Sequence, residues 1–317
     1  MRTVCIYHSV DLDGWMSAAV VSLHAVSSGG DIVIRDVISD TYLVRSEGEV
    51  DRYLDLIGWD YGHEVPDLSM YDEVIMVDIS FPRVVMEEIA PKLIWIDHHL
   101  SAMREMDMSK DFNYNVKRRI TSTDYAACEL AWFHFFSYDN LPEVVRLLGR
   151  YDCFGHRGTE EEREVVEFQY GARQLIGSIQ ECFKAIKHSL SDYSETQSVL
   201  IDEIRGVGKV IYRYLYKEAQ FIYHRAFPAV FMEGDHLRKF LVVNHERFNP
   251  INFGIDYHED GYDGFASFWM GGSGRWHFAL YNDNGKVDCS VICKRYGGGG
   301  HAGAAGFIVD DLEEVLI

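Results

Sequence analysis

The chain has 317 residues, of which 47% are hydrophobic and 14% aromatic, and its formal net charge is −20 at pH 7. This length and composition are typical of a soluble protein of about two domains, and without a long apolar run or a signal-like N-terminus we expect a cytoplasmic protein with no membrane partner. Proteins that grip long nucleic acid normally present a basic face, so the charge argues against long duplexes and favours a small phosphorylated substrate.

Three short apolar runs in the first part of the chain have the composition of strands buried on both faces, as in a parallel sheet. The runs are Val4–Tyr7, Val74–Val77 and Leu93–Ile96. Acidic residues or histidines follow each run closely and are, in chain order, His8, Asp11, Asp13, Asp78, Asp97, His98 and His99. Because ligands of such sheets bind beyond the carboxyl ends of the strands, we expect these side chains to meet at one place.

The stretches around these runs alternate between strand and helix patterns. Further strands are predicted at Ile32–Ile34 and Leu54–Trp59. Helices are predicted at Trp15–Ala25, Val84–Ile89, Asp124–Trp132 and from Pro142 to about Arg150. Ser122 or Thr123 is the expected cap of the third helix. Strands that alternate with helices predict a doubly wound α/β domain with a mainly parallel sheet.

The second half of the chain changes character twice. It is mainly helical from about 160 to 222, most clearly at Glu160–Val166 and Glu195–Gln220. Strands are then predicted at Ala229–Met232, Phe240–Val243, Phe265–Trp269 and Trp276–Tyr281. We therefore expect a first domain over 1–190, a helical linker over 191–225 and a smaller α/β domain over 226–317.

The acidic residues and histidines are suited to binding metal ions. Asp11 and Asp13 lie two positions apart before a helix, so both carboxylates can face neighbouring metals, and Asp152 adds a further candidate ligand. Oxygen and imidazole ligands without cysteine suit manganese, magnesium or iron. Two such metals can polarise a phosphoryl oxygen and generate hydroxide near neutral pH. Each motif alone could instead be a turn, a cap or a helix end, but their coincidence at strand ends favours a shared metal site.

Two other segments could contact a substrate. The glycines Gly298, Gly299 and Gly300, followed by His301, would let backbone N–H groups approach a phosphate or a base, although the same segment could be a turn before the last strand. The basic cluster Lys117–Arg119 fits a solvated loop better than a substrate-steering element.

Taken together, these motifs resemble a known family. Asp97-His98-His99 with its flanking acidic motifs resembles the DHH phosphoesterase superfamily, which includes RecJ-type exonucleases, nanoRNases, exopolyphosphatases and family II pyrophosphatases. The segment Gly297–Phe307 is similar to the glycine-rich motif of the DHH-associated C-terminal domain of RecJ-type and nanoRNase-type members. The two motifs lie in the expected order and span nearly the whole chain. The second motif argues against a pyrophosphatase, whose family carries a different C-terminal domain.

The resemblance implies a site for two divalent metal ions, manganese in the first place. The implied ligands of one metal are His8, Asp11 and Asp78. Those of the other metal are Asp13, Asp78, His98 and Asp152. Asp78 would thus bridge the metals, and His99 would face the scissile phosphate, so that Asp78, His98 and His99 are the expected catalytic residues.

Two positions depart from the family's pattern. His8 lies three residues before Asp11, whereas many relatives have one residue more or fewer. Tyr281 stands where many nanoRNase-like members have an arginine, and it cannot supply that charge to a phosphate. Arg295 is the candidate that could replace it.

We therefore expect a manganese-dependent phosphoesterase that cleaves phosphodiester bonds of short oligonucleotides or small nucleotides in a cleft between the two domains. Rival reactions are hydrolysis of 3′-phosphorylated nucleotides, of cyclic dinucleotides or of polyphosphate. A rival of another class is a non-catalytic nucleotide- or tRNA-binding module, because alanyl-tRNA synthetases carry the same type of C-terminal domain. The sequence leaves the native metal open and is compatible with a homodimer.

Overall fold

The computed structural model describes residues 2–46, 49–190, 194–300 and 302–316. Contacts within the chain define two compact units, Met1–Ile211 and Tyr212–Ile317. Each unit has its own sheet with helices, which confirms the predicted fold class. The long helix α9 (Ser194–Tyr223) runs across the boundary between the units. The finer domain limits predicted at 190 and 225 stay predictions.

Within the described residues, the first unit contains a seven-stranded sheet in the order β3-β2-β4-β1-β5-β6-β7. Neighbouring strands are parallel except for β2 and β3. The strands are β1 (Arg2–His8), β2 (Ile32–Asp36), β3 (Thr41–Arg45), β4 (Arg52–Trp59), β5 (Glu73–Val77), β6 (Leu93–Asp97) and β7 (Arg118–Thr121). After β1 the chain forms β2 and β3 at one edge and returns with β4 between β2 and β1, and it then continues with β5, β6 and β7 on the other side of β1. The carboxyl ends of β1 and β5 therefore lie at the topological switch point, where ligands of such sheets bind.

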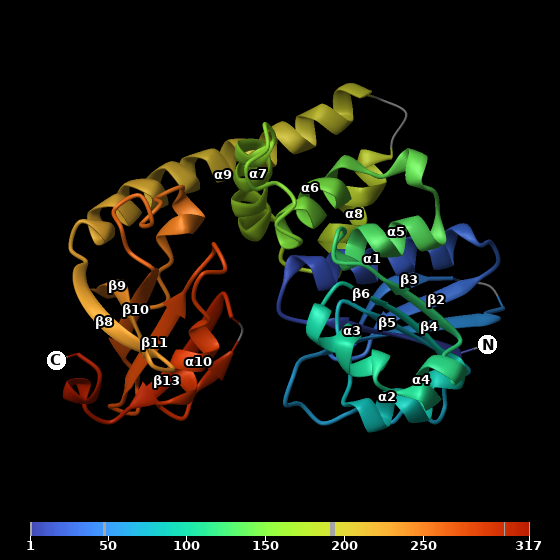
Figure 1. Ribbon diagram of the computed structural model, residues 1–317. Coiled ribbons are helices and arrows are strands. Elements are labelled where there is room, and N and C mark those ends of the chain that lie inside the picture. The colour runs from blue at the N-terminus through green and yellow to red at the C-terminus, as the bar shows by residue number, and fades with distance from the viewer. Residues whose placement is uncertain (1, 47–48, 191–193, 301, 317) are drawn as a thin grey trace. The chain divides into compact units, whose positions relative to one another are not determined.

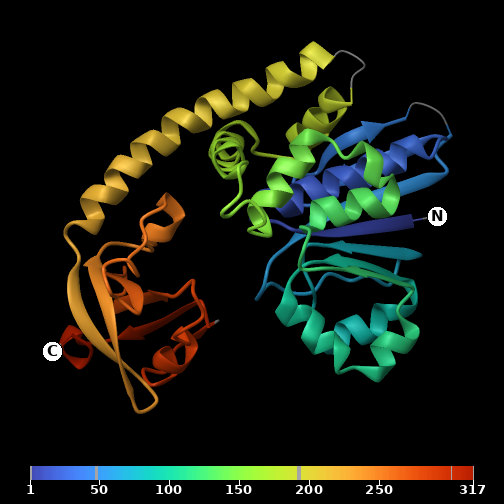
Figure 2. The same cartoon turned by 45° about the horizontal axis from the view of Figure 1, so that its top comes forward.

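Helices cover both faces of this sheet (Figures 1 and 2). The helices that contribute to one core are α1 (Leu12–Ser27), α5 (Ala127–Phe135), α6 (Glu143–Asp152), α7 (Glu162–Leu175), α8 (Ile179–Ser189) and the first half of α9. Those of the opposite core are α2 (Arg83–Ile89), α3 (Leu100–Asp107) and α4 (Lys110–Asn115). Along β1, Cys5 and Tyr7 point into the first core, while Val4 and Ile6 point into the second. Both faces of the strand are thus buried, which explains its unbroken apolar sequence.

The helix predicted to start at Asp124 starts at Ala127 instead. The cap predicted at Ser122 or Thr123 is therefore wrong. The Asp13 carboxylate, 114 residues away in sequence, accepts hydrogen bonds from the backbone N–H groups of Ala127 (2.9 Å) and Cys128 (2.8 Å). These are two of the N–H groups that a helix leaves unpaired at its start, so a distant residue performs the capping.

The basic cluster Lys117–Arg119 is not the predicted solvated loop, because Arg118 and Arg119 begin the edge strand β7. Lys117 forms an ion pair with Glu73 on β5. The Arg119 guanidinium donates to Asp107 at 2.7 Å and lies 5.2 Å from the centre of the Trp95 ring. Lys117 and Arg119 are therefore engaged by neighbouring parts of the fold.

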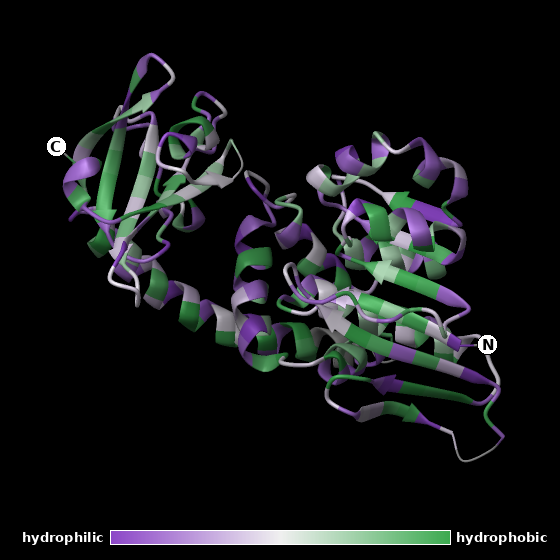
Figure 3. Cartoon of the chain, turned by 90° about the horizontal axis from the view of Figure 1, so that it is seen from below, coloured by the Kyte–Doolittle hydropathy of each residue, from purple (hydrophilic) through white to green (hydrophobic). Residues whose placement is uncertain are grey.

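The second unit has, within the described residues, a six-stranded sheet in the order β12-β13-β11-β10-β9-β8. Its strands are β8 (Phe227–Glu233), β9 (His236–Asn244), β10 (Gly264–Met270), β11 (Trp276–Tyr281), β12 (Gly299–Gly300) and β13 (Ala304–Val309). Helix α10 (Cys289–Lys294) packs on one face, and Phe231, Phe240 and Phe278 lie in the core between them. Figure 3 shows the hydrophobic colour along the strands and alternating colours along α9. The strands predicted between 229 and 281 are confirmed.

Short 3-10 helices complete the described structure. They span Ala90–Lys92, Tyr138–Asn140, Pro250–Phe253 and Leu312–Glu314. Among the helices that the structure describes, none combines the length and apolar character needed to cross a membrane.

Candidate active site

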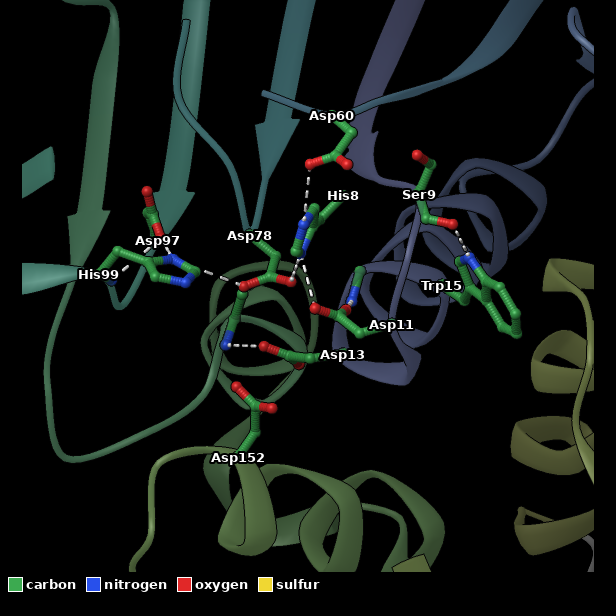
Figure 4. A network of polar contacts seen from close by, with 12 residues as sticks. His8, Ser9, Asp11, Asp13, Trp15, Asp60, Asp78, Asp97, His99 and Asp152 are labelled. Atoms are coloured by element: carbon green, nitrogen blue, oxygen red, sulfur yellow. Dashed lines mark hydrogen bonds and ion pairs between the residues drawn. The ribbon is translucent and has the colours of Figure 1, made fainter. Parts of the chain in front are cut away.

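The predicted cluster of acidic residues and histidines forms at the carboxyl ends of adjacent strands (Figure 4). His8 and Asp97 are the last residues of β1 and β6, and Asp78 directly follows β5. Asp152 is the last residue of α6. Figure 4 shows that these side chains point toward one another from separate elements. The convergence predicted from strand ends is therefore present in the structure.

His8, Asp11 and Asp78 form the first group of candidate metal ligands. His8 Nδ1 lies 2.6 Å from an Asp11 oxygen and 3.4 Å from an Asp78 oxygen. Gly14 allows this approach, because a Cβ there would lie 2.0 Å from the His8 carbonyl oxygen. Asp11 caps α1 by accepting from Gly14 N at 2.9 Å, which fixes its side chain between the strand and the helix.

Asp13, His98 and Asp152 form the second group. His98 Nε2 lies 3.1 Å from an Asp152 oxygen, 3.2 Å from Asp78 Oδ1 and 3.7 Å from an Asp13 oxygen. Asp78 is thus close to the histidine of both groups, with one oxygen near His8 and the other near His98. This is the arrangement that a bridging carboxylate requires.

Asp78 is held in an unusual backbone conformation. Its φ is +61°, in the left-handed region that non-glycine residues other than Asn and Asp rarely adopt. The backbone N–H of Asp78 donates to the Ile96 carbonyl at 3.0 Å, which ties the residue to the neighbouring strand. Such strain persists where the surrounding structure enforces it, and it is concentrated at functional sites.

The cluster is strongly charged and has two buried carboxylates at its centre. Only 3% of Asp13 and 1% of Asp78 is exposed, and burial raises the pKa of both carboxyl groups. Burial disfavours the charged form of the histidines, but the nearby carboxylates outweigh it and raise the pKa of His8 to about 10 and that of His98 to about 12. For Asp11, burial is outweighed by His8 and the Gly14 N–H, so its pKa is lowered.

These residues fit a pair of divalent metal ions. Both Asp78 oxygens, His8 Nδ1 and His98 Nε2 are buried and have no hydrogen-bond partner in proper geometry among the described residues. Buried polar atoms left unpaired are costly, and cations placed among them would satisfy them. Imidazole and carboxylate donors are the ligands that manganese, magnesium and iron accept. The first group would hold one ion, the second group the other, and Asp78 would contact both.

His99 forms a third set of possible ligands with Asp78 and His98, and a buried carboxylate holds its Nδ1. Asp97 is fully buried, and its Oδ1 accepts from the backbone N–H groups of His98 (2.7 Å) and His99 (3.1 Å). The same oxygen lies 2.8 Å from His99 Nδ1, so Nδ1 carries the hydrogen and Nε2 is left for another partner. Burial opposes charge on His99, yet Asp97 raises its pKa above the ordinary value.

One acidic residue at the site was not predicted. Asp60 directly follows β4, and its Oδ1 lies 3.5 Å from His8 Nε2, on the opposite side of the ring from Asp11 (Figure 4). A carboxylate on the second ring nitrogen of a metal-binding histidine commonly orients that ring. The signal was present in the sequence, since Leu54–Trp59 was predicted as a strand and Asp60 is the next residue.

The glycine-rich segment lines a cavity in the second unit. Gly298, Gly299 and Gly300 contribute to its wall, which encloses about 780 Å³. His301 lies outside the described residues, so its predicted role is untested. Arg295 does not appear in the described lining, and its guanidinium donates to the Gly234 carbonyl at 3.3 Å.

Neither a protein-family model nor a curated protein sequence matches this chain. Its structure is similar to that of PggH, a pGpG-specific phosphodiesterase from Vibrio cholerae, with a TM-score of 0.50 and 15% sequence identity over 99% of this chain and 93% of that protein. This similarity confirms the fold expected from the resemblance to the DHH superfamily.

Two weaker similarities involve an exopolyphosphatase-related protein and RecJ. The former, from Bacteroides fragilis, has a TM-score of 0.41 and 13% identity over 96% of this chain and 86% of that protein. RecJ from Thermus thermophilus, in complex with Mn²⁺, has a TM-score of 0.45 and 14% identity over 98% of this chain. The match spans 49% of the RecJ chain.

Proposed function

We propose that this chain is a metal-dependent phosphoesterase that hydrolyses phosphodiester bonds in short oligonucleotides or other small nucleotides. The observation that carries the proposal is the buried Asp78, which belongs to the first ligand group and has its other oxygen 3.2 Å from His98 Nε2 of the second group, at the switch point of a parallel sheet. The fold shared with a phosphodiesterase supports the reaction class. The absence of cysteine from these ligand groups favours manganese, with magnesium and iron as alternatives.

The protein residues would divide the work by position. His8 and Asp11 on one side of Asp78, and Asp13, His98 and Asp152 on the other, would hold the two metals. Metals bound there would act as Lewis acids toward the phosphoryl group and lower the pKa of the attacking water. His99 is fixed by Asp97 and 37% exposed, and when both of its ring nitrogens are protonated it would donate from Nε2 to a phosphoryl oxygen as negative charge develops.

A panel of substrates tests this function and separates it from the rival reactions. The panel contains a 5′-phosphorylated dinucleotide, a five-nucleotide RNA, a 3′,5′-bisphosphorylated adenosine, a cyclic dinucleotide and polyphosphate, each with manganese. We expect mononucleotides to be released from the two linear oligomers. The control is the double variant Asp97→Ala/His98→Ala, which removes the orienting carboxylate and a ligand and should release none.

The non-catalytic nucleotide- or tRNA-binding module makes the opposite prediction. It requires binding without turnover on every member of the panel, even when bound manganese is measured directly. The buried Asp78 favours the enzyme, because two unpaired carboxylate oxygens would be a cost without benefit in a binding module. Turnover of polyphosphate alone would replace our proposal with an exopolyphosphatase.

A further inference from the structure

The cavity of the second unit has basic residues in its described lining, although the protein as a whole is strongly acidic. The whole chain has 50 acidic and 30 basic residues. Among the described lining residues, however, there are two arginines, Arg247 and Arg275, together with His277, and there is no Asp or Glu. A concave surface lined by one sign of charge concentrates ligands of the opposite sign. The cavity is therefore suited to an anion.

The two arginines differ in their availability. Arg275 is already paired, because its Nε donates to Asp310 at 2.6 Å. Arg247 is exposed and forms no ion pair or hydrogen bond through its guanidinium with any residue that the structure describes. A cavity-lining guanidinium without a protein partner is free to bind a ligand with its full set of donors.

The backbone that carries Arg247 is held in place. Arg247 has a φ of +46°, a left-handed conformation that is costly for a residue with a long side chain. The next residue, Phe248, is only 5% exposed and packs against Phe253 and Phe265. Its backbone N–H donates to the buried hydroxyl of Ser267 at 3.2 Å. The anchored Phe248 enforces the turn, so Arg247 is presented at the cavity before any ligand arrives.

Three of the four consecutive glycines are explained by the fold. Gly297 has a φ of +74° and ends α10, where Gly297 N bonds to Lys294 O and Gly298 N to Cys293 O in a Schellman pattern. A Cβ at Gly298 would lie 2.1 Å from the Gly306 carbonyl oxygen. Gly300 has a φ of +137°, and a Cβ there would contact β13.

Gly299 has no such reason to be glycine. Its φ is not positive, and a Cβ built on it would meet nothing within 4 Å. Gly299 nevertheless lines the cavity, so a side chain there would enter the open space. The absence of that side chain leaves the backbone accessible to a ligand, which is a role that packing does not supply.

The same wall offers flat ring surfaces. Trp269 and His277 are half-buried, line the cavity and stack on each other with 5.3 Å between ring centres and 23° between planes. Aromatic faces of this kind bind nucleobases by stacking. The cavity thus combines an anion-binding residue with surfaces for a base, which is the chemistry of a nucleotide.

We propose that Arg247, beside the open backbone at Gly299, binds a phosphate group of the nucleotide and determines the specificity of this cavity for phosphorylated ligands. The inference rests on the proposed function for the identity of the ligand class. Arg247 would thus supply the phosphate contact that position 281, a tyrosine, cannot make. Arg295 is not assigned this role, because its guanidinium donates to the Gly234 carbonyl.

Calorimetric titration of the full-length protein with adenosine 5′-monophosphate and with adenosine tests the assignment. A chelator is present throughout, so that the metal site does not contribute. We expect Arg247→Ala to lower the affinity for the monophosphate about tenfold or more, which is the effect of losing a charged hydrogen bond. The affinity for adenosine should be unchanged. Arg213→Ala, an exposed arginine of α9 outside the cavity lining, is the matched control and should change neither affinity.

Arg275→Ala and two glycine variants complete the design. Arg275→Ala should lower the affinity for the monophosphate less than Arg247→Ala does. Gly299→Ala should lower this affinity without lowering the melting temperature of the protein, whereas Gly298→Ala should lower the melting temperature. The proposal is overturned if wild type does not bind the monophosphate, if Arg247→Ala binds it normally, or if adenosine and its monophosphate lose affinity equally.

Hydrolysis assays on the same variants separate this inference from the proposed function. Monophosphate binding that depends on Arg247, in a protein that hydrolyses no phosphodiester, would leave the inference standing and remove the proposed function. Phosphodiester hydrolysis with an unchanged KM in Arg247→Ala would support the proposed function and remove the inference about Arg247.

Discussion

At the scale of single residues, the site is built from groups that are unfavourable without a ligand. Asp78 combines burial, a left-handed backbone and two oxygens without hydrogen-bond partners among the described residues. Glu129, in the first turn of α5, is another buried carboxylate, with only 1% exposure. The two differ in function, because Glu129 belongs to neither group of candidate ligands.

Asp78→Asn should separate activity from stability. Asparagine tolerates the left-handed backbone at this position and removes the buried charge. We expect hydrolysis to fall by more than about 100-fold, beyond the loss typical of residues that only support ligands. In chelator, the variant should be more stable than wild type by about 1 kcal/mol, because burial disfavours the charged form of Asp78 and asparagine carries no charge. Thermal unfolding with and without manganese measures this, and a lower stability in chelator would contradict it.

Glu129→Gln should change how stability depends on pH. Burial raises the pKa of Glu129 from 4.5 to about 7, and the opposing contributions of the Ala126 N–H, Arg150 and Arg146 do not cancel it. Between these pH values the unfolded chain has lost the proton while the folded protein keeps it, so stability falls as pH rises from 4.5 to about 7.

The shift corresponds to ~3 kcal/mol, since one pKa unit is worth about 1.4 kcal/mol. Glu129→Gln should therefore stabilise the protein at pH 8 and have little effect at pH 4.5. Chemical denaturation at both pH values is the measurement, and Glu161→Gln, the acidic neighbour that raises the Glu129 pKa, is the companion variant. An equal effect of Glu129→Gln at both pH values would show that its carboxyl group titrates normally.

At the scale of elements, the strands were predictable and the contacts between distant elements were not. Val4–Tyr7, Val74–Val77 and Leu93–Ile96 are apolar because both faces of each strand are buried. These runs, together with the acidic residues and histidines that follow them, were enough to predict where the site lies. The cap of α5 was not predictable, because Asp13 reaches it through the tertiary fold. Likewise, nothing local distinguishes a basic loop from the edge strand β7, whose register depends on β6.

The dual role of Asp13 gives a paired prediction. Asp13→Ala and Asp152→Ala should both abolish hydrolysis, since each removes a candidate ligand. Only Asp13→Ala should also destabilise the protein in chelator, by about 1–2 kcal/mol, because it leaves the Ala127 and Cys128 N–H groups without a cap. Urea denaturation of both variants is the measurement. Equal midpoints would show that the cap contributes nothing.

At the scale of the whole molecule, the charge distribution disfavours the binding of long polyanions. The net charge of −20 follows from the composition. The lack of acidic residues in the described lining of the cavity could not be predicted, because the fold brings β10, β11 and the glycine segment together there. Arg247 had no sequence signal, because its significance depends on the left-handed turn and on the lack of a partner among the described residues.

This distribution predicts a weak dependence on salt. A protein that contacts many phosphates loses about 10³–10⁵ in affinity between 50 and 200 mM salt. Here the KM for a five-nucleotide RNA should change by less than about tenfold over that range, because only a few phosphates meet basic residues. Steady-state kinetics at both ionic strengths tests this, with the same RNA and a strongly basic ribonuclease as a positive reference. A loss of a thousandfold would indicate an extended basic track.

The central claim is that the two ligand groups around Asp78 hold two metals and carry out hydrolysis. Its most direct test counts bound manganese and measures hydrolysis of a 5′-phosphorylated dinucleotide on the same samples of wild type and Asp152→Ala. We predict two ions per chain and turnover in wild type, and fewer bound ions without turnover in a variant of unchanged stability. Turnover in chelator, or turnover by Asp152→Ala equal to that of wild type, would contradict the claim.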